Sequence, residues 1–466
     1  MTPPRNPLFR KAQHIHFVGI GGSGMSGIAE VLVNLSFTVS GSDLARTPVT
    51  ERLEKLGAKV FTGHAAGHIT GADVVVISSA VGLDNPEVVE ARQRKVPVIP
   101  RAEMLGELMR MKYGVAIAGS HGKTSTTAMV AQVLSGAGLD PTIVIGGRLN
   151  TLGSSAKLGK GDLMVAEADE SDGSFLGLSP TIAVVTNIDA EHLNHYGSME
   201  ALTDAFAGFL NKVPFYGLGV VCLDDPQIQG IMPRLTRTLL TYGLASQSDL
   251  VGTNLELKEF TSRFEVIFRG RWLGDVHMRV PGRHSIYNAL AAIGVGLEFD
   301  IKFQDIAAHL AEFSGADRRF QLKGMVDDIM VIDDYGHHPT EIRATLSAAR
   351  DGWKRRTLVV FQPHRYSRVQ ALMEEFARSF YQADVLVVTE VYRAGEEPLP
   401  NINGETLAAA IERHGHKDVI YARDLEEAER LVRERVQKGD MVITLGAGDV
   451  WKVADGFLRD TARRNR

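Results

Sequence analysis

Short runs of Val, Ile and other apolar residues recur along the chain, and glycine or polar residues follow most of them before a helical pattern begins. Apolar runs that alternate with amphipathic helical stretches are typical of parallel sheets covered by helices. Residues 255–280 instead alternate apolar and polar positions, which predicts an antiparallel hairpin. The predicted strands lie at His14–Gly19, Phe37–Ser40, Lys59–Phe61, Val74–Ser78, Val98–Ile99, Tyr113–Ala118, Leu163–Ala166, Ile182–Thr186, Met325–Ile332, Thr357–Phe361, Val385–Val388 and Met441–Thr444.

The pattern and the length of 466 residues together predict an α/β protein of about three domains. We expect a Rossmann-like N-terminal domain at 1–108, a central P-loop ATPase-type α/β domain at 109–315 and a C-terminal Rossmann-like α/β domain at 316–466. The segments near 105–112 and 312–318 are the expected linkers, about which the domains would close on their substrates.

Composition narrows the class of protein. Hydrophobic residues make up 44% of the chain, which excludes disorder, and a net charge of −5 offers no general basic field for nucleic acid. The single cysteine, Cys222, excludes an internal disulfide and is expected in a buried strand. No apolar run reaches 18 residues and the N-terminus lacks the apolar core of a signal peptide, so we expect a cytoplasmic protein without membrane insertion.

A glycine-rich turn follows the first predicted strand. Gly19, Gly21 and Gly24 satisfy the G-x-G-x-x-G spacing, with an additional Gly22 inside it, and Asp43 follows about 20 residues later. Such a turn allows backbone N–H groups to approach a diphosphate at a helix N-terminus. The residues alone leave open NAD or FAD, another nucleotide diphosphate, or a purely structural turn.

A second glycine-rich loop, Gly119–Thr127, joins a strand to a helix and predicts ATP or GTP binding. Lys123 would neutralise charge between phosphates, and the Thr124 hydroxyl could bind Mg²⁺. The loop is shorter than the usual phosphate loop because Ile117 occupies the position of its first glycine. A structural turn before a helix is the alternative, but it would not require the lysine.

Acidic and histidine residues follow the next two strands of this segment. Glu167 continues one strand and is the predicted Mg²⁺ ligand, whereas the acids that follow it are interpreted as a solvated turn, with a role in the chemistry as the alternative. His192 lies after the other strand and is expected to contact a metal or the γ-phosphate. Asn288, on an otherwise apolar helix, needs a polar partner, and a hydrogen bond at the edge of the core would satisfy it.

Polar residues also follow the predicted strands of the C-terminal segment. Arg365 and Arg368 are candidates for a carboxylate clamp, because the planar guanidinium presents two parallel donors. A basic surface loop is the alternative interpretation.

Six motifs in this order resemble the Mur ligase family, and within it the branch that adds alanine. They are Val18–Met25, Gly119–Thr127, Glu167–Ser174, Ala316–Phe320, Asp333–Pro339 and Gln362–Arg368, and the resemblance extends from about residue 14 to residue 451. It implies an ATP-dependent amide-forming ligase that joins L-alanine to UDP-N-acetylmuramate through an acyl phosphate, in peptidoglycan precursor synthesis. It also implies Mg²⁺, most simply two ions.

The resemblance assigns roles residue by residue. The implied UDP-sugar contacts are Gly19, Gly21, Gly22, Ser23, Gly24, Met25, Asp43 and Ser79. The implied ATP contacts are Gly119, Ser120, His121, Gly122, Lys123, Thr124, Ser125, Asn288, Arg319 and Asp334. The implied amino-acid contacts are Tyr335, His337, Arg365 and Arg368. The implied metal ligands are Thr124, Glu167 and His192, and the implied catalytic residues are Lys123, Glu167 and His192.

The chain departs from the family pattern after the third predicted strand of the central segment, Ile182–Thr186. The family usually has Asp-His-Leu-Asp-His-Tyr, whereas residues 191–196 have Glu and Asn at the acidic positions, which leaves the roles of Glu191 and Asn194 open. Sister ligases carry a carbamoylated lysine about fifteen residues later, where this chain has Phe206 and Ala207, so no carbamate is expected. A family member that adds a recycled peptide, a nicotinamide-dependent oxidoreductase and a non-catalytic nucleotide sensor are the alternatives. Oligomeric state and discrimination among L-alanine, glycine and L-serine do not follow from the sequence.

Overall fold

The computed structural model describes residues 12–78, 80–146 and 156–464 of the chain. The chain divides into two compact units. The first unit contains the chain as far as Asn254, together with Phe264–Val276 and Tyr287–Ser314. The second contains Leu255–Arg263, His277–Ile286 and the chain from Gly315 onward.

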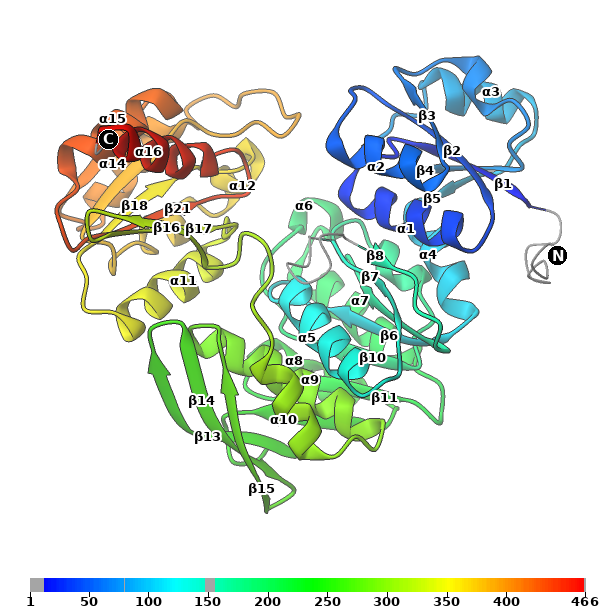
Figure 1. Cartoon of the computed structure of the whole chain (residues 1–466), viewed down its shortest axis with the longest axis horizontal. Helices are drawn as coiled ribbons and strands as arrows, with labels where there is room; N and C mark the ends of the chain where they lie inside the picture. The colour runs from blue at the N-terminus through cyan, green and yellow to red at the C-terminus, as the bar shows by residue number, and fades with distance from the viewer. Residues whose placement is uncertain (1–11, 79, 147–155, 465–466) are drawn as a thin grey trace. The chain divides into compact units, whose positions relative to one another are not determined.

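The N-terminal part of the first unit is built on five parallel strands in the order β3-β2-β1-β4-β5 (Figure 1). Helices α1 and α2 pack together on one face of this sheet, and α3 packs with the short helix η2 on the other. This arrangement is Rossmann-like, as predicted. The elements are β1 (His14–Val18), α1 (Ser23–Asn34), β2 (Thr38–Asp43), α2 (Pro48–Leu56), β3 (Lys59–Thr62), η2 (Ala66–Ile69), β4 (Val74–Ile77), α3 (Pro86–Gln93), β5 (Val98–Pro100) and α4 (Arg101–Arg110).

The central sheet has ten strands in the order β15-β14-β13-β12-β11-β10-β6-β9-β7-β8. Strand β6 (Tyr113–Ala118) lies between β10 (Ile182–Val185) and β9 (Leu163–Glu167), and all three run parallel. Their carboxyl ends therefore bring three loops to one edge of the sheet. The remaining strands are β7 (Thr142–Val144), β8 (Ala156–Lys157), β11 (Leu218–Cys222), β12 (Leu239–Gly243), β13 (Leu250–Lys258), β14 (Thr261–Phe268) and β15 (Arg271–Met278).

The helices of this central region include α5 (Lys123–Gly136), which directly follows the second glycine-rich loop, and α10 (Phe303–Ala311), which packs against α5. The hairpin predicted at 255–280 is instead part of three successive strands, β13 to β15, because a further turn interrupts the alternation at Arg269 and Gly270. The other α-helices of the central region are α6 (Leu193–Tyr196), α7 (Met199–Asn211), α8 (Pro226–Ile231) and α9 (Arg283–Glu298).

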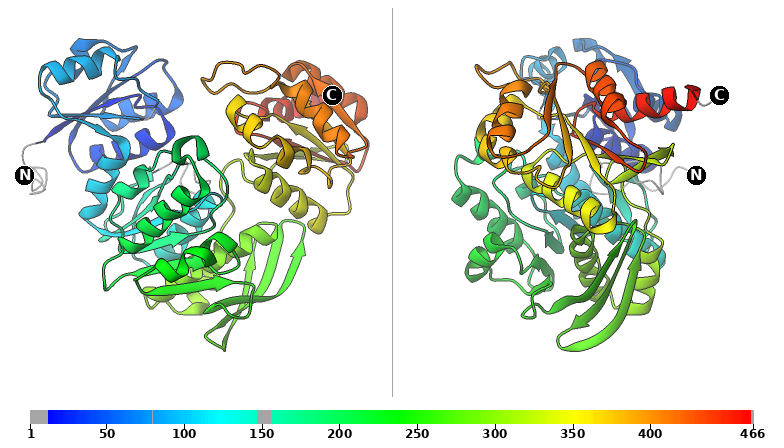
Figure 2. Two further views of the ribbon diagram at one scale, coloured as in Figure 1. Left: turned by 180° about the vertical axis from the view of Figure 1, so that it is seen from behind. Right: turned by 90° about the vertical axis from the view of Figure 1, so that its left-hand side faces the viewer.

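The C-terminal sheet has six strands in the order β16-β17-β21-β18-β19-β20, all parallel except β16. Helices cover both faces, and each face has its own buried apolar cluster (Figure 2). The elements are β16 (Gln321–Val326), β17 (Ile329–Asp334), α11 (Pro339–Gly352), β18 (Thr357–Phe361), α12 (Tyr366–Ala371), α13 (Met373–Ala377), β19 (Val385–Thr389), α14 (Gly404–Arg413), β20 (Val419–Ala422), α15 (Leu425–Arg435), β21 (Met441–Leu445) and α16 (Trp451–Arg464).

The single strand predicted at Met325–Ile332 is wrong, because the chain reverses within it. Asp327 and Asp328 adopt left-handed backbone angles, with φ of 51° and 63°, and join β16 to the antiparallel β17. Aspartate tolerates this region better than most residues, so the acidic pair was the available signal for a turn.

Local sequence explains where several helices begin. The side chains of Thr47, Ser198 and Asp424 each accept a hydrogen bond from the backbone N–H three residues later, at the start of α2, α7 and α15.

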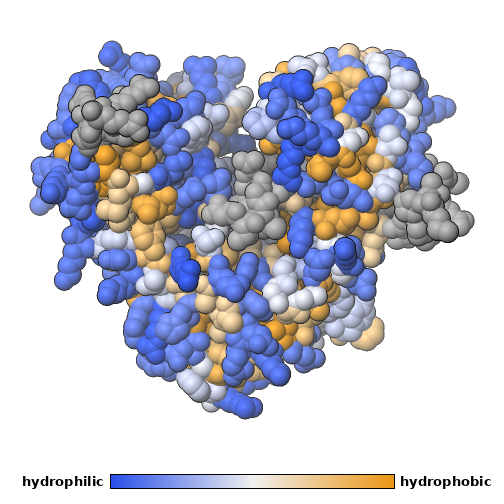
Figure 3. Space-filling view, viewed as in Figure 1, coloured by the Kyte–Doolittle hydropathy of each residue, from blue (hydrophilic) through white to orange (hydrophobic). Residues whose placement is uncertain are grey.

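Within the described ranges, no helix is long and apolar enough to cross a membrane. The face drawn in Figure 3 mixes hydrophilic and hydrophobic residues on both units. Cys222 is buried as predicted, and burial raises the pKa of its thiol to about 12.

Candidate active site

The loop between β6 and α5 depends on two glycines for its shape. Gly119 has φ of 127° and Gly122 has φ of 81°, both in the region that favours glycine. A Cβ at Gly119 would collide with Thr186, and one at Gly122 would lie 2.7 Å from Asn288 Oδ1. Asn288 on α9 therefore lies directly beside the loop, which places the predicted ATP contact next to the residues expected to bind phosphate.

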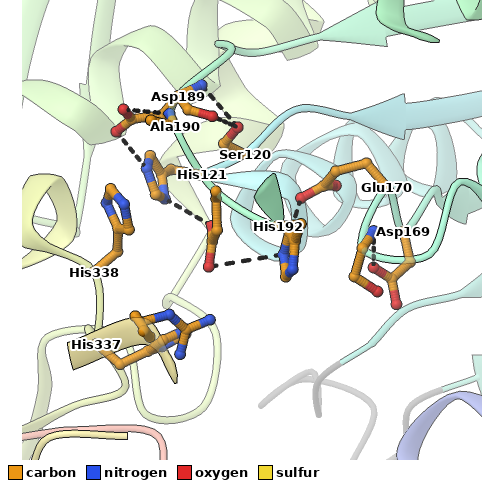
Figure 4. Close-up of polar contacts among 12 residues, drawn as sticks. Ser120, His121, Asp169, Glu170, Asp189, Ala190, His192, His337 and His338 are labelled. Atoms are coloured by element: carbon orange, nitrogen blue, oxygen red, sulfur yellow. Dashed lines mark hydrogen bonds and ion pairs between the residues drawn. The ribbon is translucent and has the colours of Figure 1, made fainter. Parts of the chain in front are cut away.

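The loop is fixed to the strand ends around it. The backbone N–H of His121 donates to Asn187 Oδ1 at 2.8 Å, and the Thr186 hydroxyl donates to the His121 carbonyl at 2.6 Å. The Asp189 N–H donates to Ser120 Oγ at 2.8 Å, and His121 Nε2 lies 2.9 Å from Asp189 Oδ2 (Figure 4). These contacts hold the loop in one geometry before any ligand arrives, which lowers the entropy lost on binding.

Lys123 is the cation at the centre of this site. Its Nζ donates to the carbonyls of Gly119 and Ser120 at 2.7 and 3.1 Å and lies 2.8 Å from the Glu170 carboxylate. Burial acts to lower the pKa of Lys123, but the carboxylates of Glu170 and Glu191 outweigh it and raise that pKa. Lys123 is therefore protonated at physiological pH.

Two oxygen donors lie together at the end of β9. The Thr124 hydroxyl is 3.1 Å from each carboxylate oxygen of Glu167. Glu167 also accepts the backbone N–H of Gly146 at 2.8 Å. A hydroxyl and a carboxylate at a phosphate-binding loop are the donors that Mg²⁺ takes in nucleotide sites.

A second group of metal-binding character contains Glu170, Glu191 and His192, whose ligand atoms all lie within 4.8 Å of one another. His192 Nε2 is 3.8 Å from Glu170 and 3.7 Å from Glu191 (Figure 4). Burial raises the pKa of Glu170 to about 7, with the nearby Lys123 opposing that shift. His192 has φ of 58° and directly precedes the short helix α6.

The structure thus divides the predicted metal ligands between two neighbouring groups. Thr124 and Glu167 form one, whereas His192 joins Glu170 and Glu191. Sequence reasoning ranked neither Glu170 nor Glu191 as a ligand, although each lies in an acidic or histidine-rich motif at a strand end. Only the order β10-β6-β9 brings those two strand ends together.

The first glycine-rich turn is held by Asp43, the last residue of β2. Asp43 Oδ2 accepts the backbone N–H of Gly21 at 2.8 Å, and Gly19 adopts φ of 79°. Gly22, Gly24 and Met25 line a cavity of about 220 Å³ that also reaches Glu167 of the second loop region. The predicted contact Ser79 lies outside the described residues, and the side chain of Ser23 is not among those described.

In the second unit, the predicted nucleotide contacts lie around β17. Asp334 is buried and accepts the backbone N–H groups of Phe320 and Gly336, both at 2.7 Å. Burial raises the pKa of its carboxyl group. Arg319 lies over the Tyr335 ring at 5.1 Å and pairs with Glu341 at 3.3 Å.

The predicted amino-acid clamp lies on the segment that follows β18. Arg365 has φ of 69°, a strained angle for a residue with a Cβ. Arg368 Nη1 lies 3.3 Å from Nδ1 of His364, and burial lowers the pKa of His364 to about 3, so that ring is neutral. His337, another predicted contact, lies with its ring 5.7 Å from that of His364.

A loop that sequence reasoning missed holds this strained segment in place. Tyr392 stacks on His364 with ring centroids 5.5 Å apart, and its carbonyl accepts the N–H of Arg365 at 2.9 Å. Glu396 accepts both the backbone N–H of Ser367 at 3.0 Å and its hydroxyl at 2.6 Å. No local pattern predicts this pairing, because about 30 residues separate its partners (29 between Ser367 and Glu396).

Comparison with known proteins identifies the family to which this chain belongs. Three profiles match in succession: the Mur ligase family catalytic domain at residues 14–113, the Mur ligase middle domain at 117–296 and the Mur ligase glutamate ligase domain at 318–448. The chain belongs to the Mur ligase family.

Particular relatives are similar over nearly their whole length. A UDP-N-acetylmuramate–L-alanine ligase from Geotalea uraniireducens is 58% identical over 97% of this chain and 98% of its own. The protein of the same name from Trichlorobacter lovleyi is 57% identical over 97% of this chain and its entire length, 100%. Among solved structures, the UDP-N-acetylmuramate–alanine ligase of Thermotoga maritima matches with a TM-score of 0.82, 30% identity, and coverage of 97% of this chain and 99% of that one.

Proposed function

We propose that this chain is an ATP-dependent ligase that joins L-alanine to the lactyl carboxylate of UDP-N-acetylmuramate, giving an amide, ADP and phosphate. The observation that carries the proposal is the 58% identity, over 97% of the chain, to a relative named for that activity. A loop shaped for phosphate, with a buried lysine and two groups of metal-binding residues, supports it. The reaction consumes ATP and a nucleotide sugar, and we place it in the cytoplasm.

We assign one substrate to each of three regions. Residues 1–108 would bind the UDP-sugar, 109–315 ATP, and 316–466 the amino acid. The glycine-rich turn then holds the diphosphate of the UDP-sugar, rather than a nicotinamide cofactor, with Asp43 fixing the turn through Gly21. Arg319, Asp334 and Asn288 would contact ATP, and Tyr335, His337, Arg365 and Arg368 would contact the amino acid.

The chemistry requires an activated carboxylate, because a carboxylate is a poor acyl donor. One lactyl carboxylate oxygen attacks the γ-phosphorus of ATP, the bond from that phosphorus to the β–γ bridging oxygen breaks, and ADP leaves. The amino group of L-alanine then attacks the acyl carbon and loses a proton, and phosphate leaves as the carbon–oxygen bond breaks. Lys123 would neutralise charge on the γ-phosphate during the first transfer.

The donors present fit Mg²⁺. Thr124 and Glu167 would hold one ion, and Glu170 and Glu191, with His192 as a further donor, would hold a second. When bound, the ions supply positive charge that screens the repulsion between the carboxylate and the γ-phosphate. Protonation of Glu170, whose pKa is about 7, would compete with metal binding at its carboxylate. A cation bound beside the carboxylate would in turn favour the ionised form.

The proposal is tested by phosphate release from ATP with each co-substrate omitted in turn. We expect release only when UDP-N-acetylmuramate and L-alanine are both present. Replacing L-alanine with glycine, L-serine or a tripeptide then tests specificity, and a clear preference for the tripeptide would instead indicate a peptide-recycling ligase. Release that is independent of the UDP-sugar would contradict the proposed reaction.

A further inference from the structure

Arg101 is an arginine that neither the motifs nor the implied family contacts account for. It is the first residue of α4 and directly follows β5. Because β5 runs parallel to β4 and β1, its carboxyl end lies at the same edge of the sheet as the glycine-rich turn after β1. The fold therefore places Arg101 at the same edge of the sheet as the proposed UDP-sugar site.

The side chain extends between that turn and the acids of the central region. Its Nη2 lies 3.2 Å from Asp169 Oδ2, and the side chain is only 22% exposed. A Cβ at Gly24 would collide with its Nη1. Gly24 does not adopt a left-handed φ, and a Cβ there would require the guanidinium to move from its present position.

The charges of the residues that line the cavity indicate a role for Arg101 in binding an anion. Among the described residues that line the cavity of about 220 Å³, Arg101 is the only cation, whereas Glu167 and Asp169 are both acidic. UDP-N-acetylmuramate would bring a diphosphate and a lactyl carboxylate to this region. Without a compensating cation, both would face two carboxylates in a partly enclosed space, where repulsion is poorly screened.

We propose that Arg101 binds an oxyanion of the UDP-sugar substrate, exchanging its ion pair with Asp169 for a two-pronged contact to that group. The position of Nη1 over Gly24, in the first turn of α1, favours the diphosphate as the source of the oxyanion. The guanidinium has five N–H donors, and its two terminal nitrogens, Nη1 and Nη2, can donate in parallel to one oxyanion once Nη2 has left Asp169. This assignment rests on the proposed function.

The test measures equilibrium binding of three nucleotides to wild-type protein and to Arg101→Met and Arg101→Lys. UDP-N-acetylmuramate carries both anions, UDP-N-acetylglucosamine lacks the lactyl carboxylate, and UMP lacks the second phosphate. We expect Arg101→Met to weaken binding of both UDP-sugars about tenfold or more, with partial recovery in Arg101→Lys and little change for UMP. Weakening confined to UDP-N-acetylmuramate would assign the carboxylate as the oxyanion instead.

Two further variants separate binding from a structural role. Arg110→Met, on the exposed side of the same helix, should bind all three nucleotides as the wild type does. Asp169→Asn breaks the ion pair without removing the guanidinium, so it should retain affinity for UDP-N-acetylglucosamine. Equal losses in Asp169→Asn and Arg101→Met, or no loss in Arg101→Met, would overturn the assignment. If the wild-type protein itself fails to bind UDP-N-acetylmuramate, that result contradicts the proposed function, and the assignment of Arg101 falls with it.

Discussion

Lys123 owes its charge to carboxylates from two separate strand ends, Glu170 after β9 and Glu191 after β10. This clustering matters because a buried lysine without such partners would tend to lose its proton. The same acids are the candidates for a metal site, so the charge of the lysine and the binding of metal depend on one set of residues. A single substitution here is therefore expected to affect turnover rather than folding alone.

Lys123→Ala should lower kcat by about 100- to 1000-fold, the range seen when one preorganised charge-stabilising group is removed. Binding of UDP-N-acetylmuramate should be unchanged, because the UDP-sugar contacts lie on the other glycine-rich turn. Steady-state phosphate release and direct binding measure the two effects. Lys55→Ala, at the end of α2, is the control. A kcat near that of the wild type would refute the role of Lys123.

Glu87 on α3 is a buried acid that contributes to stability rather than to the proposed chemistry. It accepts a hydrogen bond from Ser42 at 2.5 Å and lies 2.7 Å from His68 Nδ1 and 3.5 Å from His16 Nε2. Burial acts to raise the pKa of Glu87, but these partners outweigh it and lower the pKa from 4.5 to about 2. The stabilisation is therefore complete above pH 4.5 and is lost as the pH falls toward 2.

Glu87→Gln should remove this pH-dependent stabilisation, which amounts to about 3 kcal/mol. Hydrogen exchange of the amides of β1 and β2 at pH 7 should accelerate by up to about 100-fold, because that method reports local opening in a protein of several domains. Glu90→Gln, which breaks a surface ion pair with Arg94 on the same helix, provides the comparison. Equal protection in the two variants would show that the Glu87 contacts add nothing.

At the scale of elements, the loop after β19 determines the shape of the segment after β18. Arg365 is held at a positive φ by contacts from Tyr392 and by the hydrogen bonds of Glu396 to Ser367. Strain of this kind persists only where the surroundings impose it. We therefore expect the loop to position both arginines of the proposed amino-acid clamp.

Glu396→Ala should raise the KM for L-alanine about tenfold, because it removes two hydrogen bonds to a carboxylate, and should leave the KM for ATP nearly unchanged. The neighbouring Glu397→Ala, at an exposed position, should change neither constant. Initial rates with each substrate varied in turn measure the difference. Parallel changes in both KM values would indicate a general loss of structure instead of positioning.

At the scale of the whole molecule, the proposed contacts are distributed over both compact units. Lys123, Glu167 and His192 belong to the first unit, whereas Arg319, Arg365 and Arg368 belong to the second. Acyl and phosphoryl transfer require reacting atoms within about 3.5 Å of one another. One reaction can use both sets only in a state in which the two units present them to the same substrates, which is the closure predicted from the sequence.

Small-angle scattering should therefore show a smaller radius of gyration when UDP-N-acetylmuramate and a non-hydrolysable ATP analogue are both bound than with either alone. The segment at 312–318 lies at the boundary between the units, whereas most of the predicted linker at 105–112 belongs to the continuous helix α4. We accordingly expect the motion to be concentrated at the later segment. An unchanged radius with both ligands would contradict closure.

The sequence by itself determined most of the strands, the two glycine-rich loops, the α/β class and the family, because each is encoded by residues close together in the chain. It did not predict the strands β7, β8, β12 and β20. It failed where the chain reversed at Asp327 and Asp328 and where the alternation at 255–280 continued into three strands. Only the tertiary structure decided which strand ends meet. Strand order placed Glu170 and Glu191 with His192, Tyr392 against His364, and Arg101 against Gly24. Such contacts join residues far apart in sequence, and their geometry depends on sheet topology, which no local pattern records.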